Sequence, residues 1–195
     1  MIRSIFLVFA LLLLVDAAAA RDERSIKDLR NALVALAPDV DPGETELTSV
    51  TAHTTARSLK GKYHVVLNPE FQCFLINIGL RQCGYCGHWT RDIGEALKEL
   101  KLKTLVLHWG VADEGTTGES NCVVITARNQ PFQEGIIIDG WRRAGRLFWC
   151  PVKQDDEYEL EHHYGHSGIT AWKEAALFTT WLQDYRHAYE FEPTA

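Results

Sequence analysis

The residues best suited to covalent chemistry lie in the run Cys83-Gly84-Tyr85-Cys86-Gly87, which directly precedes a helical pattern. Unpaired N–H groups and the helix dipole stabilise a thiolate at a helix N-terminus and lower the thiol pKa. Cys86 is therefore the best candidate for a nucleophile in this sequence. Such a nucleophile also needs a base to take its proton and a third group to orient that base.

The elements that must position Cys86 change in character along the chain. Helical periodicity dominates the first half, whereas short β-branched and aromatic runs follow residue 103. Helices followed by consecutive strands indicate an α+β fold with a mostly antiparallel sheet, on which the helix bearing Cys86 packs. We expect helices over residues 25–37, 44–59, from Pro69 onward, 86–100 and, at the C-terminal end, 169–189, and strands over residues 104–109, 121–127, 135–139 and 146–149.

Asp139 is the acidic candidate because it ends one of these strands. If strands 121–127 and 135–139 form a hairpin, Asp139 lies across from Ser120 and Asn121. A helix packed over that end of the sheet brings Cys86 to the same cleft. A strand-terminal Asp followed by Gly also commonly caps a turn, so both roles stay open for Asp139.

This order of motifs resembles transglutaminase-like domains of the papain-like group, and more closely bacterial exported proteins of that type. The likeness runs from about residue 71 to 152. The resemblance implies that Cys86 is the nucleophile and Asp139 the orienting acid, and we expect Trp89, Asn121 and Trp141 to contact substrate. The matching stretches are residues 74–80, 84–89, 107–110, 139–142 and 145–149.

The histidine of that family pattern is missing, because this chain reads Glu119-Ser120-Asn121 where the pattern has Glu-His-Asn. A serine hydroxyl does not ionise usefully near neutral pH, so Ser120 is at most a substrate contact. His108, at the end of a predicted strand, is the candidate replacement base. His88 follows Cys86 by two residues and points roughly 200° away on a helix, which favours a surface histidine.

Cys83 and Cys86 could instead form a disulfide. The Cys83–Cys86 spacing is typical of a thiol–disulfide redox centre or of a structural bridge, although a helix rather than a central strand precedes the pair. The five cysteines are an odd number, which leaves at least one thiol unpaired within the chain. The sequence alone does not determine the pairing among Cys73, Cys83, Cys86, Cys122 and Cys150.

A histidine-rich run, residues 161–166, is the one weak metal candidate. His162, His163 and His166 are of the type that binds zinc or copper, but the segment reads as a loop without a clear four-ligand spacing. We therefore expect no metal and no cofactor, and keep this run as a possible source of a base.

Residues 1–20 read as a signal peptide, with Arg3 before a short apolar run and alanines before Arg21. The remaining residues, 21–195, fit a single domain whose core spans about residues 62–152. No later segment is apolar enough to span a membrane, so we expect a periplasmic or secreted protein. The net charge of −6 argues against nucleic-acid binding.

Three functions follow from these residues. In the first, Cys86 attacks an amide or ester carbonyl of a peptide, protein or cell-wall substrate, and acyl transfer or hydrolysis proceeds through a thioester. In the second, the same fold binds a peptide or wall component without cutting it, and Ser120 marks a lost activity. In the third, Cys83 and Cys86 perform thiol–disulfide exchange.

Overall fold

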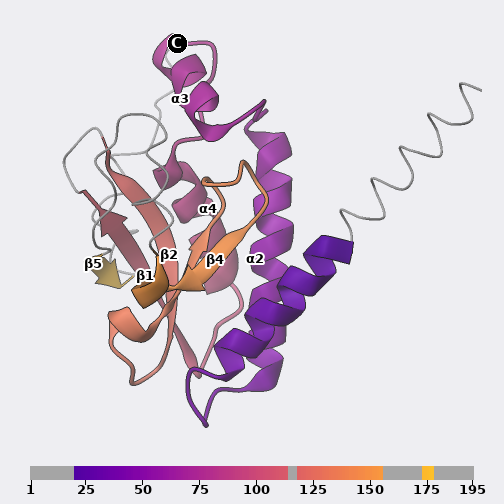
Figure 1. Ribbon diagram of the computed structural model, residues 1–195, viewed down its shortest axis with the longest axis vertical. Coiled ribbons are helices and arrows are strands. Elements are labelled where there is room, and N and C mark those ends of the chain that lie inside the picture. Colours follow the sequence, from indigo (N-terminus) through magenta and orange to yellow (C-terminus); the bar gives the residue numbers. More distant parts are fainter. Residues whose placement is uncertain (1–19, 114–117, 156–172, 178–195) are drawn as a thin grey trace, which may run out of the picture.

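Five antiparallel strands form one sheet in the order β4-β3-β2-β1-β5. The computed structural model describes residues 20–113, 118–155 and 173–177, and the remaining residues are drawn as a thin trace in Figure 1. The strands are β1 (Leu105–Ala112), β2 (Ser120–Ala127), β3 (Ile136–Asp139), β4 (Phe148–Pro151) and β5 (Lys173–Leu177).

The described helices all precede the sheet in sequence, apart from two short 3-10 turns. A helix over residues 20–34 comes first. It is followed by α2 (Pro42–Lys62), α3 (Pro69–Asn77) and α4 (Cys86–Lys98), and the 3-10 turns are η1 (Phe132–Glu134) and η2 (Val152–Gln154).

Local sequence explains where these helices begin. Asp41 caps α2 by accepting a hydrogen bond from the Glu44 N–H at 2.9 Å, and Asn68 caps α3 by accepting one from Phe71 at 2.8 Å. A proline follows each cap at the start of the helix, where its missing N–H costs nothing. α4 begins differently, because the ring of His88 reaches back to the N–H groups that precede the helix.

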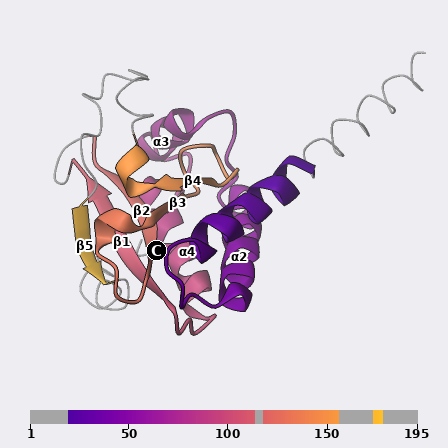
Figure 2. The ribbon, with the colours of Figure 1, turned by 60° about the horizontal axis from the view of Figure 1, so that its bottom comes forward.

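The two faces of the sheet carry different side chains, because successive residues of a strand point to opposite sides. One face packs with α2 and α4 in the larger core, which includes Trp109, Val123 and Ile138. The opposite face forms a smaller apolar cluster that includes Cys122, Ile137 and Phe148. Figures 1 and 2 show the helix over residues 20–34, α2 and α4 on the same side of the sheet.

The predicted α+β class and antiparallel sheet are confirmed, with boundaries that shift by a few residues. The predicted C-terminal helix is wrong for Lys173–Leu177, which form β5 and pair with β1. The segment reads Lys-Glu-Ala-Ala-Leu, which favours a helix locally, but the open edge of β1 offers backbone partners that outweigh this preference. The rest of the predicted helix lies outside the described residues, as does nearly all of the predicted signal peptide.

Within the described ranges, no helix is long and apolar enough to cross a membrane.

Candidate functional site

Cys86 is the first residue of α4, and its sulfur faces the start of β2. The thiol donates to the carbonyl oxygen of Glu119 at 3.7 Å, and the side-chain amide of Asn121 donates to the sulfur at 3.6 Å. Trp109 fixes this amide, because its indole N–H donates to the Asn121 Oδ1 atom at 2.6 Å. The Asn121 amide also donates to the Glu119 carboxylate at 2.9 Å, so its orientation is held from both ends.

The Cys86 thiol is protonated at neutral pH. Burial raises its pKa to about 11, and the hydrogen bonds from the Asn121 side chain and backbone only partly oppose this shift. The negative charge of Asp139 acts in the same direction as burial. The low pKa expected from the helix position is therefore wrong, because desolvation of the thiolate outweighs the favourable helix terminus.

Asp139 caps a turn and pairs with an arginine. Its Oδ1 atom accepts hydrogen bonds from the Trp141 and Arg142 N–H groups at 2.7 and 3.0 Å, and the Arg142 Nε atom lies 3.2 Å from Oδ2. Arg142 also binds Asp155 with two hydrogen bonds of 2.6 and 2.9 Å. Burial raises the pKa of Asp139 despite this ion pair. These contacts correspond to the turn-capping role rather than to the orientation of a base.

The register places Asp139 close to where the sequence predicts it, but on the other face of the sheet. Val123 pairs with Ile138, so the next position places Asp139 across from Cys122. Asp139 also pairs with Phe148, which belongs to the cluster on the face opposite α4. Cys86 contacts Asn121, which shares the helix-covered face with Trp109. Asp139 and Cys86 therefore approach this end of the sheet from different faces, although the charge of Asp139 still acts on the sulfur.

His108 is not brought to Cys86. Its Nε2 atom lies 2.8 Å from the Thr126 hydroxyl, and its ring makes an edge contact with Phe132, with 6.0 Å between centroids. Phe132 belongs to the cluster on the face opposite α4. His108 therefore has the position of a buried, hydrogen-bonded structural histidine.

His88 is buried, so the prediction of a surface histidine is wrong. Its Nδ1 atom accepts hydrogen bonds from the Gly84 and Tyr85 N–H groups, both at 3.2 Å. Burial, together with the positive charge of Arg91, lowers its pKa to about 4. The neutral ring caps the start of α4 through its Nδ1 atom.

The predicted substrate contacts differ in how accessible they are. Trp89 is only 1 % exposed and packs edge-on against Tyr63, with 5.2 Å between ring centroids, so it is a core residue. Ser120 is buried on β2, and its hydroxyl has no hydrogen-bond partner within the described part of the chain. Trp141 is half-buried against the larger core. Asn121 is buried too, and its partners are protein groups.

All five cysteines are free thiols in this structure. Cys83 packs against the larger core, and its carbonyl oxygen accepts a hydrogen bond from Gln72 at 2.8 Å. Cys86 instead faces β2. Thiol–disulfide exchange between Cys83 and Cys86 stays a prediction.

Metal binding by the histidine-rich run also stays a prediction, because His162, His163 and His166 lie outside the described residues. Among the residues that are described, no group of three or more histidine, cysteine or acidic side chains is placed to hold a metal ion.

Sequence reasoning missed the role of Asn121 as the side chain that holds the sulfur. Strand alternation could have predicted it. Asn121 lies two residues before Val123 and four before Ile125, so all three side chains point to the face of the sheet that the helices cover. The same alternation turns Ser120 toward the side of its partner Ala112, in the opposite cluster.

Comparison with known proteins yields no matching family model, no similar curated protein and no similar solved structure. Function is therefore inferred from this chain's own residues.

Proposed function

We propose that this chain is a non-catalytic, peptide-binding module of transglutaminase-like architecture, in which Cys86 is a structural thiol. The single observation that carries this proposal is the donation of the Asn121 amide to the Cys86 sulfur at 3.6 Å. A general base must lie within hydrogen-bond reach of the proton that it removes. A carboxamide nitrogen and a peptide carbonyl surround this sulfur instead, and neither takes up a proton near neutral pH.

The exposed apolar surface around α3 supports a peptide as the ligand. Phe74, Ile78 and Leu80 are 53, 50 and 61 % exposed, and the Phe71 and Phe74 rings stack with 6.1 Å between centroids. Contiguous exposed apolar side chains commonly mark an interaction site. This surface adjoins the Cys86 loop, because the Tyr85 hydroxyl donates to Asn77 at 2.5 Å. Because Phe74, Ile78 and Leu80 offer no hydrogen-bonding groups, we expect the ligand to be a peptide with apolar side chains rather than a sugar chain.

Alkylation of Cys86 as a function of pH tests the absence of catalysis. We expect iodoacetamide to modify Cys86 more slowly in the folded protein than in urea-unfolded chain below pH 8, with rates read for the individual peptide by mass spectrometry. The unfolded chain is the matched control, because it carries the same thiol without burial. Faster modification of the folded protein below pH 7 would overturn the proposal and support acyl transfer instead.

Peptide binding is tested separately. Panels of apolar and polar peptides are titrated against wild-type protein, Phe74→Ser and Cys86→Ala. We expect apolar peptides to bind the wild-type protein and Cys86→Ala equally, and Phe74→Ser more weakly. Binding that needs Cys86 and ignores Phe74 contradicts this assignment.

A further inference from the structure

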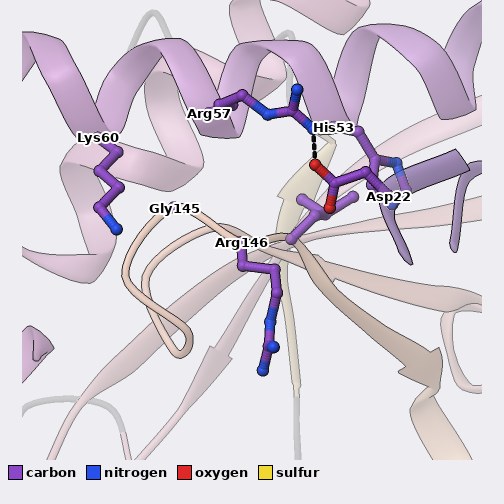
Figure 3. Close-up of a pocket in the computed structure, with 7 residues that line it drawn as sticks. Asp22, His53, Arg57, Lys60, Gly145 and Arg146 are labelled. Carbon is purple, nitrogen blue, oxygen red and sulfur yellow. Dashed lines mark ion pairs between the residues drawn. The ribbon is translucent and has the colours of Figure 1, made fainter. Parts of the chain in front are cut away.

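A second candidate site lies beside α2. A cavity of about 200 Å³ opens between α2, the start of the helix over residues 20–34 and the loop that joins β3 to β4. Figure 3 shows Arg57 and Lys60 on α2, Asp22 on the first helix and Arg146 on the loop; Arg57 points toward Asp22, and the Arg146 side chain extends from the loop away from α2. None of these residues belongs to the candidate site at Cys86.

The cavity is positively charged in an acidic protein. Arg57, Lys60 and Arg146 line it, and Asp22 is the one carboxylate among its lining residues. Asp22 pairs with Arg57. Among the described residues, Lys60 and Arg146 form no ion pair, so two positive charges lack a counter-charge although the chain carries a net charge of −6. Uncompensated positive charges that line one cavity attract an anion to it.

His53 adds no charge to the cavity, but hydrogen bonds hold its ring in place on one side of it. Its Nδ1 atom lies 2.8 Å from the Ser49 carbonyl oxygen, and its Nε2 atom lies 2.8 Å from the Ser25 hydroxyl. The indole N–H of Trp149 donates to the same hydroxyl at 3.1 Å. Burial lowers the pKa of His53, so the ring is neutral and its nitrogens are occupied near pH 7. These hydrogen bonds connect the first helix, α2 and β4.

The loop that carries Arg146 is held tightly against α2. Gly145 has a φ of +87°, and a Cβ atom there would lie 2.5 Å from the Lys60 Cβ and 3.1 Å from the Ala56 carbonyl oxygen. Only glycine fits this close approach without strain. The Gly145 N–H also donates to the Gly140 carbonyl at 2.9 Å. The backbone next to Arg146 is thereby held against Lys60, so that both residues line the same cavity.

We propose that this cavity binds a phosphate monoester group, free or at the end of a larger molecule. Two uncompensated cations match a dianion, and a phosphate monoester carries a charge of about −1.5 to −2 at pH 7. The guanidinium groups offer paired donors to phosphate oxygens, and the lysine adds a point charge. Asp22 competes with the ligand for Arg57, so the negative charge of Asp22 lowers the affinity for phosphate.

Titration calorimetry with inorganic phosphate and with glycerol phosphate, at low ionic strength and pH 7.5, tests this site. We expect one saturable site for both compounds, with acetate at equal ionic strength giving no comparable heat. Lys60→Gln and Arg146→Gln should each weaken binding about tenfold. Lys98→Gln removes the same charge from the exposed end of α4 and should leave binding unchanged.

Asp22→Asn should have the opposite effect on phosphate affinity. Removing the carboxylate that competes for Arg57 should tighten phosphate binding several-fold. Lys60 and Arg146 are exposed, so their variants should keep the wild-type unfolding curve. The proposal is overturned if phosphate gives no saturable binding, if acetate binds equally well, or if Lys60→Gln behaves like Lys98→Gln. Peptide binding at α3 is independent of each of these results.

Discussion

At the residue scale, Asn121 connects the sheet to the candidate site. It accepts from Trp109 at 2.6 Å and donates to both the Cys86 sulfur and the Glu119 carboxylate. A buried amide that satisfies three partners costs more to remove than any single one of its hydrogen bonds contributes. Asn121 is therefore more important for the geometry of this site than the thiol that it holds.

Replacing Asn121 with alanine tests this role. The Trp109 indole then loses its acceptor, and we expect the free energy of unfolding in urea to fall by about 1–3 kcal/mol. The Cys86 pKa should rise further, because the hydrogen bond that stabilises its thiolate is gone. The pH dependence of Cys86 alkylation measures that rise.

Ser120→Ala is the matched control, one residue away on the same strand. The Ser120 hydroxyl is buried and makes no hydrogen bond to the described residues, so its loss should leave stability equal or slightly higher. Equal destabilisation by both substitutions would show that Asn121 only fills space.

The sequence predicted which residues gather at this end of the sheet but not the faces they occupy. β3 (Ile136–Asp139) consists of three isoleucines followed by Asp139, so no apolar–polar alternation shows which face each side chain occupies. Alternation predicts a face only when the two faces of a strand differ in polarity. The burial that raises the Cys86 pKa also depends on packing between distant segments, which local motifs do not encode.

At the element scale, Glu44 links the start of α2 to the residues that precede β1. Its carboxylate accepts hydrogen bonds from the Lys103 N–H at 2.6 Å, the Thr104 N–H at 2.8 Å and the Thr104 hydroxyl at 2.7 Å. Burial opposes ionisation, but the hydrogen bonds from Thr104 and Lys103 prevail and lower the Glu44 pKa. The start of β1 is thus positioned by a helix that lies 60 residues earlier in the chain.

We expect Glu44→Ala to lower the free energy of unfolding by about 1–3 kcal/mol, because three donors lose their acceptor. Glu46→Ala is the control on the same helix, since Glu46 makes an ion pair with Arg30 in which both side chains are substantially exposed. Such pairs contribute about 0–1 kcal/mol. Urea denaturation at pH 7 distinguishes the two, and equal losses would contradict the role of Glu44.

Helices with a proline-led start were predictable from sequence, and β5 was not. Pro69 and the preceding cap define α3 locally, which is why α3 begins where the sequence indicates. The Lys173–Leu177 segment has helical composition and becomes a strand through its pairing with β1, far away in sequence. Local propensity is a weak guide wherever a sheet edge supplies hydrogen-bond partners.

At the scale of the whole molecule, the buried neutral histidines make stability depend on pH. The His88 pKa is about 4 in the folded state and near 6.5 when the chain is unfolded. Between these values the unfolded chain binds more protons, so folding weakens as the pH falls through this range. The lowered pKa of His53 also makes the folded state less stable as the pH falls. The raised pKa of Asp139 has the opposite effect on stability.

A difference measurement isolates His88. We expect the wild-type protein to lose about 2–3 kcal/mol more than His88→Gln between pH 7 and pH 4.5, because glutamine keeps an acceptor for the Gly84 and Tyr85 N–H groups but does not titrate. Urea unfolding curves at both pH values measure this difference. Parallel curves for the two proteins would show that His88 is protonated as readily in the folded state as in the unfolded one.

The position of β5 affects how the chain reaches its fold. β1 (Leu105–Ala112) is paired on one side by its neighbour in sequence, β2, and on the other by Lys173–Leu177. Until that late segment arrives, an apolar strand exposes a row of unpaired backbone groups, which is a template for pairing with a second chain. During synthesis at about 5–20 residues per second, this exposure lasts for several seconds. Self-association of nascent chains is therefore the hazard that this topology creates, and prompt docking of β5 removes it.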